Sequence, residues 1–184
     1  MYHIADDQRA RKSARKLVEG LEVCLARKKY EEISISDLCE AAGIGRATFY
    51  RLFDNMADVL YYQCSEVVRL IADSVERDGI MSLHQALLDF INEWMKRRKL
   101  LETLQTTNQL ELLYRAHMEN IASFRKIIET VGHMDGTQEA YVVGLLTAAL
   151  PAFIRVWTLR GERETPEELY ICMKSSASMI GNLL

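Results

Sequence analysis

The sequence predicts an all-α protein, and three observations support that fold class. The 184 residues include only two prolines and nine glycines, too few for the many tight turns of an all-β fold. Apolar residues recur every three or four positions along most of the chain, which is the spacing of one helix face. Capping residues separate these stretches, and 49% hydrophobic with 27% charged residues is typical of a globular protein.

The first helix is predicted at residues 9–28. Its apolar face is formed by Ala14, Leu17, Val18, Leu21, Cys24 and Leu25. Positive charge at a helix N-terminus opposes the helix dipole, yet the first turns are basic. The basic residues are Arg9, Arg11, Lys12, Arg15 and Lys16. Either these side chains serve a contact outside the helix, or they form a solvated face.

Two short helices are predicted next. Ser34 and Asp37 have the spacing of a capping box, which starts a helix at residues 35–42, and Gly43 ends it. A second short helix is predicted at residues 45–53. Two short helices joined by a glycine-containing turn of about three or four residues indicate a helix-turn-helix.

Three further helices each begin at a pair of capping residues three positions apart. The pairs are Asn55 with Asp58, Ser82 with Gln85, and Asn108 with Glu111. The helix that starts at Asn108 is predicted to run to residue 131 and to end at Gly132. Between the second and third of these helices, a basic run at residues 96–99 is interpreted as a solvated helix end, with a second anionic site as the alternative.

The last two predicted helices differ in character. Residues 137–160 are apolar nearly all round, so this helix must be covered on every side, and a second subunit is the simplest cover. Pro151 is expected to kink it or to lengthen its turn. The final helix has a strong start, because Thr165 is followed by Pro166 and, at the third helical position, Glu168.

Several classes of protein are disfavoured. No apolar run approaches the ~20 residues of a membrane helix, and the N-terminus lacks the apolar core of a signal peptide, so we expect a cytoplasmic protein without a membrane partner. The nucleophile, zinc-protease and nucleotide-binding motifs are missing, so we expect no enzyme, no catalytic residues, no metal and no cofactor. The cysteines are widely spaced and are expected to be reduced core thiols, with a redox-sensing pair as the alternative: Cys24, Cys39, Cys64 and Cys172.

The helix-turn-helix carries a more specific pattern. The matching residues are 35–44, 47–53 and 54–60, and within this segment residues 41–53 fit A-A-G-[IV]-x-x-x-T-[FL]-Y-x-x-F. This segment resembles the DNA-binding domain of the tetracycline-repressor (TetR) family of bacterial regulators. The resemblance implies a DNA-binding domain at residues 1–54 and an effector-binding and dimerisation domain at residues 55–184.

A recognition helix fits the major groove, about 12 Å wide, and reads base edges from its N-terminal end. Small Gly45 and Ala47 allow close approach, Arg46 reaches guanine or phosphate, and Phe49 and Phe53 face the core. Thr48 is expected to contact a phosphate, and Tyr50 a sugar or a base. Arg51 is either a DNA contact or a solvated side chain. The resemblance implies that Ser34 also contacts a phosphate.

Two positions depart from the family pattern. The family often has His at the position of Leu52 and a phosphate-binding Lys at the position of Met56. Fewer phosphate contacts predict weaker, less salt-dependent binding, for which the basic N-terminal run would compensate. These departures motivate an alternative function, a TetR-like co-regulator acting mainly through a protein partner bound at the C-terminal domain.

The C-terminal part resembles the family more loosely, through W-x-x-x-G-x-x-x-[ST]-P-E-E at residues 157–168. The resemblance implies that the last two helices form a four-helix dimer interface. The candidate interface residues are Leu145, Ala149, Phe153, Trp157, Leu169, Met173 and Ile180. The candidate effector-binding residues, for which a packed core is the alternative, are Trp94, Tyr114, His117, Met118, Tyr141 and Phe153.

The charge is distributed unevenly, which the net charge of −3 conceals. Residues 1–53 carry 10 Lys and Arg against 8 Asp and Glu, while the remainder carries 13 against 18. The function predicted is a TetR-like repressor of neighbouring genes. It would bind a palindromic double-stranded operator as a homodimer and be released by an unidentified small molecule.

Overall fold

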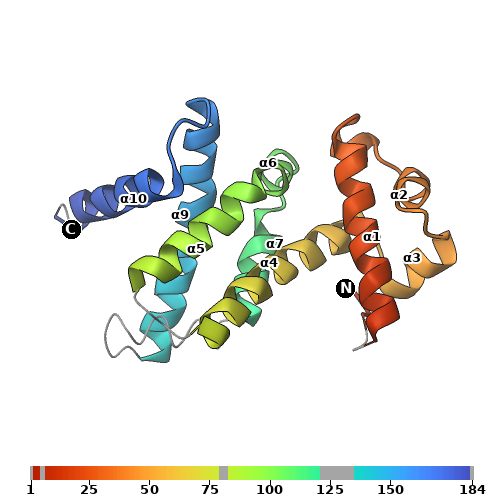
Figure 1. Ribbon diagram of the computed structural model, residues 1–184, viewed down its shortest axis with the longest axis horizontal. Coiled ribbons are helices and arrows are strands. Elements are labelled where there is room, and N and C mark those ends of the chain that lie inside the picture. The colour runs from red at the N-terminus through yellow and green to blue at the C-terminus, as the bar shows by residue number, and fades with distance from the viewer. Residues whose placement is uncertain (1, 5–6, 79–82, 121–134, 183–184) are drawn as a thin grey trace. The chain divides into compact units, whose positions relative to one another are not determined.

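The computed structural model describes residues 2–4, 7–78, 83–120 and 135–182 (Figure 1). The helices are α1 (Gln8–Leu25), the 3-10 turn η1 (Tyr30–Glu32), α2 (Ile35–Ala42), α3 (Arg46–Leu52), α4 (Met56–Asp78), α5 (Leu83–Lys96), α6 (Arg98–Thr106), α7 (Leu110–Glu119), α9 (Gly136–Leu159) and α10 (Pro166–Gly181). The described residues form no strand beyond a single antiparallel bridge between Tyr2 and Phe53. The predicted all-α class is confirmed.

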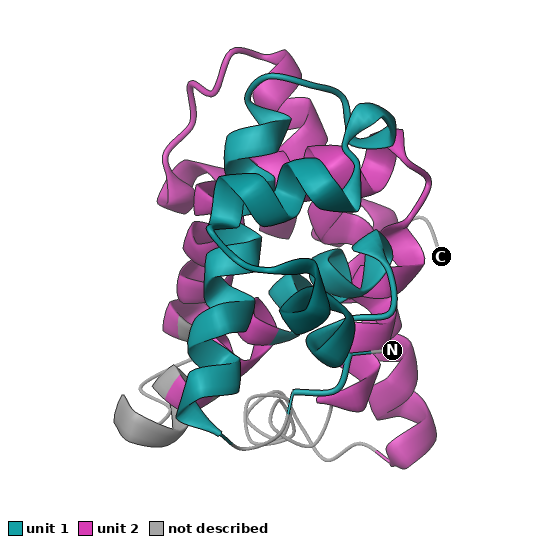
Figure 2. Cartoon of the chain, turned by 90° about the vertical axis from the view of Figure 1, so that its right-hand side faces the viewer, with its two compact units in different colours: residues 1–65 teal, residues 66–184 magenta. Residues whose placement is uncertain are grey.

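The chain divides into two compact units, residues 1–65 and residues 66–184, drawn in teal and magenta in Figure 2. The first unit contains α1, α2, α3 and the start of α4, and the second contains the rest of α4 and the later helices. The functional boundary expected after residue 54 stays a prediction, because the compact units divide later, inside α4.

The core of the N-terminal unit is tight where α1 meets α2. A Cβ atom placed on Gly20 of α1 would lie 2.8 Å from the Ala42 Cβ and 2.9 Å from the Ala42 nitrogen, so the two backbones touch at this glycine. From α3 and its end, Phe49, Leu52 and Phe53 are all buried in this core. The predicted inward orientation of the two phenylalanines is therefore confirmed.

Most predicted helix ends agree with the structure, because each is fixed by a local hydrogen bond. Ser34 and Thr165 are the N-caps of α2 and α10, each with a complete capping box. Gly43 ends α2 with φ +62°, a left-handed conformation that favours glycine.

The prediction that a helix starts at Asn108 is wrong. Asn108 has φ +55° and ends α6, since its N–H bonds to the Gln105 carbonyl and the Gln109 N–H bonds to the Leu104 carbonyl at 2.7 Å. This is the hydrogen-bond pattern of a Schellman motif, for which Asn is suited because it tolerates the left-handed region. Helix α7 begins at Leu110 and ends at Glu119, and the predicted extension to residue 131 and Gly132 lies outside the described residues.

The basic run of residues 96–99 is largely paired within the C-terminal unit. Lys96 and Arg97 both contact Glu93, and Arg98 Nε lies 2.6 Å from Glu162 Oε1 in the turn after α9. Three of the four cations thus have carboxylate partners, Glu93 being shared by two of them, as expected for a helix end.

Helix α9 is the most apolar element of the described chain. Its length and the mean hydropathy of 1.8 over an 18-residue stretch of it would suit a membrane span, but a single such helix is weak evidence, and core helices share these properties. It packs against α7, α6, α5 and α10, and it continues through Pro151 without interruption. The Gln105 side chain donates to the Pro151 carbonyl at 2.9 Å and ties α6 to this point of the helix.

Candidate nucleic-acid interface

Helix α3 begins without a side-chain cap. Gly45 is its N-cap, with the ordinary φ of −69°, and its carbonyl accepts the N–H groups of Thr48 and Phe49. A Cβ atom at Gly45 would meet nothing within 4 Å. The fold therefore does not require a glycine here, and the open backbone at the start of α3 is accessible to a molecule outside the chain.

The two sides of α3 are sharply different. Phe49 and Leu52 are buried, whereas Arg46, Ala47 and Arg51 are exposed and Tyr50 is 49% exposed. The exposed residues lie one helical turn apart, so they form one continuous face. Thr48 is half-buried at its edge. The structure thus brings the predicted DNA-contact residues of α3 together on one surface, beside Gly45 at the start of the helix.

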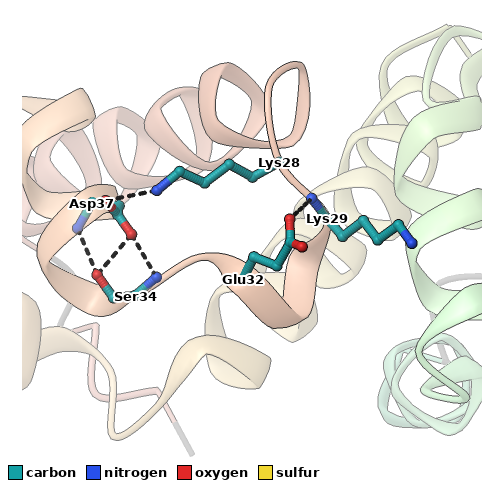
Figure 3. Close-up of polar contacts among 5 residues, drawn as sticks. All are labelled: Lys28, Lys29, Glu32, Ser34 and Asp37. Carbon is teal, nitrogen blue, oxygen red and sulfur yellow. Dashed lines mark hydrogen bonds and ion pairs between the residues drawn. The ribbon is translucent and has the colours of Figure 1, made fainter.

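Ser34, the predicted phosphate contact on α2, is already engaged in the capping box (Figure 3). Its hydroxyl donates to Asp37 Oδ2 at 2.8 Å and accepts the Asp37 N–H at 3.1 Å. The Ser34 backbone N–H also donates to Asp37, at 2.9 Å. A phosphate at this point would have to share the hydroxyl with the cap.

Asp37 brings negative charge to the start of α2. The backbone N–H of Ser34 lowers the pKa of Asp37 to about 2, aided by the Ser34 hydroxyl and by Lys28, whose Nζ lies 3.0 Å from Asp37 Oδ1 (Figure 3). The carboxylate is thus ionised at neutral pH. Its negative charge stabilises α2, because it lies at the N-terminal, positive end of the helix dipole. Lys28 compensates this charge, so Ser34 does not face an uncompensated anion.

The two departures from the family pattern differ in place. Leu52 is 1% exposed and packs in the core, while Met56 is half-buried in the first turn of α4. Neither supplies a cation to the surface next to α3. The basic side chains of the first turns of α1 lie at the surface instead, since Arg9, Lys12 and Arg15 are exposed, as are their neighbours Arg11 and Lys16.

Sequence reasoning missed one set of contacts to α3. The backbone N–H of His3 donates to the Leu52 carbonyl at 2.8 Å, and Tyr2 pairs with Phe53. These residues are some fifty positions from α3 in the sequence and carry no periodic pattern. Backbone hydrogen bonds between distant segments leave no such signal, so only the tertiary structure reveals them.

Two of the predicted effector residues form a buried ring cluster in the C-terminal unit. Trp94 of α5 is fully buried, and its ring lies 5.8 Å from that of His117 on α7; Phe90 contacts both rings. Burial lowers the pKa of His117 to about 4, although the contact of its Nδ1 with the Leu113 carbonyl, at 3.1 Å, acts in the opposite direction. His117 is therefore neutral at physiological pH.

The other predicted effector residues are placed differently. Tyr114 is 40% exposed and lies beside Gly144 of α9, where an added Cβ would be 3.7 Å from its ring. Tyr141 is 77% exposed, while Met118 and Phe153 are half-buried. The structure thus joins Trp94 with His117 but leaves Tyr141 at the surface, and a shared role of all six residues stays a prediction.

The predicted dimer residues fall into three groups. Leu145 and Ile180 are exposed, and Ala149, Phe153 and Met173 are half-buried. Trp157 and Leu169 are buried within the chain itself, where the Trp157 indole donates to the Glu164 carbonyl at 2.9 Å. Trp157 and Leu169 therefore contribute to the core of a single subunit, and their participation in a dimer interface stays a prediction.

One side of α9 is nevertheless apolar and exposed from residue 141 to residue 159. Its residues recur at intervals of three or four, so they share one face of the helix. We call these residues the α9 stripe: Tyr141, Leu145, Ala148, Ala152, Val156 and Leu159. On α10, Ile171 and Met179 are also exposed. Contiguous apolar surface of this kind marks an interaction site.

The cysteines correct one expectation. Cys24, Cys39 and Cys64 are buried free thiols, as predicted, but Cys172 on α10 is exposed. Burial raises the pKa of Cys64 to about 12, so this thiol stays protonated and unreactive. The expectation of four core thiols is wrong for Cys172, because its position faces outward from a helix with a single buried residue, Leu169, in its described part.

Comparisons with known proteins agree with this geometry. Residues 17–61 match the family model described as bacterial regulatory proteins, tetR family. A comparison with curated proteins finds no match.

Among solved structures, the chain is similar to Lin0861 from Listeria innocua, with a TM-score of 0.76 and 19% identity over 97% of this chain and 96% of that one. It is also similar to the dihydroxyacetone kinase operon activator DhaS, with a TM-score of 0.58 and 18% identity over 93% of each chain. The fatty acid degradation regulator FadR from Bacillus halodurans has a TM-score of 0.58 and 14% identity, again over 93% of each chain. Identities this low establish the shared fold alone.

The family match spans the end of α1, all of α2 and α3, and the start of α4, which are the elements that bury Phe49 and expose the face of Arg46 and Tyr50. Residues 17–61 therefore form a DNA-binding domain of the tetR-family type, and the chain is a TetR-like DNA-binding regulator.

Proposed function

We propose that the protein is a homodimeric repressor of neighbouring genes. It binds a palindromic operator and is released by a small molecule that binds the C-terminal unit. The observation that carries the proposal is the exposed face of α3, whose opposite face is fully buried and whose N-terminal end is an open glycine. Such a helix has no partner for its outer side among the described residues of its own unit.

The proposed DNA contacts follow from where each side chain lies. Gly45 and Ala47 let the start of α3 approach the groove, where Arg46 donates to guanine or phosphate. Tyr50 lies one turn further along, next to the exposed Arg51. Thr48 and Ser34 are proposed to contact phosphates, and the exposed basic turns of α1 supply the charge that Met56 does not.

The proposed dimer covers the α9 stripe with the same stripe of a second copy, together with the exposed apolar residues of α10. Leu145 and Leu159 are 70% and 77% exposed, so their burial releases substantial apolar surface from water. Two copies of α3 would then enter successive major grooves, with half-sites about 34–36 Å apart.

The proposed effector binds beside Trp94. The Trp94 indole N–H is buried and has no hydrogen-bond acceptor among the described residues. Leaving such a donor unsatisfied costs about 1–3 kcal/mol. An uncharged ligand with an acceptor oxygen and an apolar body fits this donor, because the surrounding rings are apolar and His117 is neutral.

Selection of DNA from a pool of randomised duplexes tests the proposed function. We expect the full-length chain to enrich a palindrome at low salt and Arg46→Ala to lose about 1–3 kcal/mol of binding to it. Arg163→Ala is the matched control, because Arg163 is an exposed arginine in the turn before α10.

Absence of any enriched sequence, with a folded dimer present, would overturn the proposed repressor. A stoichiometric protein partner without a sequence-specific DNA footprint would instead support the co-regulator.

A further inference from the structure

We propose that residues 2–4 form an N-terminal arm that positions the recognition helix α3, with Tyr2 and His3 as the positioning residues. The inference rests on the proposed reading of DNA by α3, and it assigns a role to a segment that lies outside the residues of the family match.

The first support is the backbone pairing at the end of α3. The last carbonyls of a helix lack partners within the helix, and the His3 N–H satisfies the Leu52 carbonyl at 2.8 Å. Phe53 is extended, with φ −139° and ψ 139°, which lets Tyr2 form the antiparallel bridge with it. With seven residues, α3 is too short to hold its own conformation, so contacts from outside fix its end.

The second support is a continuous series of aromatic contacts from the arm to α3. The Tyr2 ring lies 5.4 Å from Tyr61 and 5.3 Å from Tyr62 of α4. The ring centroids of Tyr62 and Phe53 lie 5.8 Å apart, and those of Phe53 and Phe49 lie 5.9 Å apart. Phe49 in turn meets the edge of Tyr50 at 5.3 Å. Packed interiors transmit displacements, so a shift of the Tyr2 ring is passed through these contacts to the exposed Tyr50.

The His3 side chain adds a smaller contribution. Its Nε2 lies 3.0 Å from Asp54 Oδ1, but the two side chains are 54% and 53% exposed. Water screens a pair of this kind. The backbone hydrogen bond and the Tyr2 ring are therefore the contacts whose loss should matter most.

Positioning has a distinct consequence for DNA binding. Hydrogen bonds to base edges need a geometry held within about 0.5 Å, whereas attraction to phosphates tolerates displacement. Loosening the end of α3 should reduce binding to the specific sequence and spare binding to other sequences. A residue that merely stabilised the fold would change both by the same factor.

Two matched pairs of variants in the full-length chain test the arm. His3→Pro removes the N–H that donates to Leu52, while His3→Ala keeps it and removes only the imidazole. Tyr2→Ala removes the ring, while Tyr2→Phe keeps it. The probes are the duplex that the unmodified chain enriches from a randomised pool and a scrambled duplex of the same length.

We expect His3→Pro and Tyr2→Ala to weaken binding to the enriched duplex by about tenfold, because bidentate base contacts lose their geometry. Binding to the scrambled duplex and the slope of log affinity against log salt should stay unchanged. His3→Ala and Tyr2→Phe should stay within about twofold of the unmodified chain. In the free protein, hydrogen exchange at residues 46–53 should be faster in Tyr2→Ala than in Tyr2→Phe.

Equal losses on both duplexes with a smaller salt slope would show that the arm binds phosphate itself and would overturn the inference. Unchanged binding of both duplexes by His3→Pro and Tyr2→Ala would also overturn it, while leaving the proposed function intact. If the unmodified chain enriches no duplex, the proposed function fails and the positioning role fails with it.

Discussion

At the scale of single residues, Gly20 and Gly45 are glycines for different reasons. An alanine at Gly20 would place its Cβ within 3.0 Å of three Ala42 atoms, two of them backbone, which no side-chain rotation relieves. We expect Gly20→Ala to destabilise the protein by about 1–3 kcal/mol, because this overlap outweighs the roughly 1 kcal/mol that alanine gains in helix propensity. Urea unfolding measures the change, and a stability equal to or above that of the unmodified chain would contradict the close packing of α1 on α2.

Gly45 provides the matched case, because its surroundings are open. We expect Gly45→Ala to leave the free energy of unfolding within about 0.5 kcal/mol of the unmodified value while weakening binding to the enriched duplex, since the added methyl group would stand between α3 and the groove. Titration of the same duplex with both proteins measures the effect. Unimpaired binding would show that DNA does not approach this glycine.

His117 makes stability depend on pH. Its pKa is lowered to about 4 in the folded protein by burial, against an ordinary value of 6.5, so the unfolded chain binds more protons between these values. Stability due to the neutral ring is complete above pH 6.5 and is lost as the pH falls toward 4, by about 2–3 kcal/mol at pH 4.5.

Urea unfolding at pH 7 and pH 4.5 measures this loss. Titration of the carboxylates is common to the unmodified chain and to His117→Leu, so the variant should lose about 2–3 kcal/mol less between the two pH values. An equal loss in both proteins would assign the pH dependence to other groups.

At the scale of elements, helix ends were predictable where one local hydrogen bond decides them. Ser34, Gly43 and Thr165 lie at the predicted ends because each bond joins residues only a few positions apart. Asn108 was assigned to the wrong helix because asparagine suits both an N-cap and a left-handed helix end, and the sequence does not distinguish the two. In the structure, the backbone N–H groups of Asn108 and Gln109 donate to carbonyls of α6, which makes Asn108 the end of that helix.

The capping box of α10 gives a test at this scale. Thr165 Oγ1 accepts the Glu168 N–H at 3.3 Å, and Glu168 accepts the Thr165 N–H at 2.8 Å. We expect Thr165→Ala to reduce stability by about 1 kcal/mol, while Thr165→Ser, which keeps the hydroxyl, should restore most of it. Thermal unfolding of the three proteins distinguishes the cap from the loss of a methyl group, and equal losses in both variants would argue against the cap.

At the scale of the whole molecule, the α9 stripe gives the test of the proposed dimer. Leu145→Glu places a charge within the surface that would be buried, and we expect the dissociation constant of the dimer to increase about 100-fold or more while the subunit stays folded. Thr158→Glu is the control, because Thr158 is exposed on α9 outside the stripe. Sedimentation velocity over a range of concentrations measures both, and a Leu145→Glu dimer as stable as the control would contradict the interface.

The sequence alone determined most of the helices, although not α6, many of the helix ends, and the helix-turn-helix with its buried Phe49 and exposed Arg46. It could do so because helical periodicity and capping act between residues a few positions apart. Only the tertiary structure decided that Tyr2 and His3 hold the end of α3, that Leu52 is buried, and that Cys172 is exposed. Those properties depend on contacts between segments far apart in the chain, and local spacing contains no record of them.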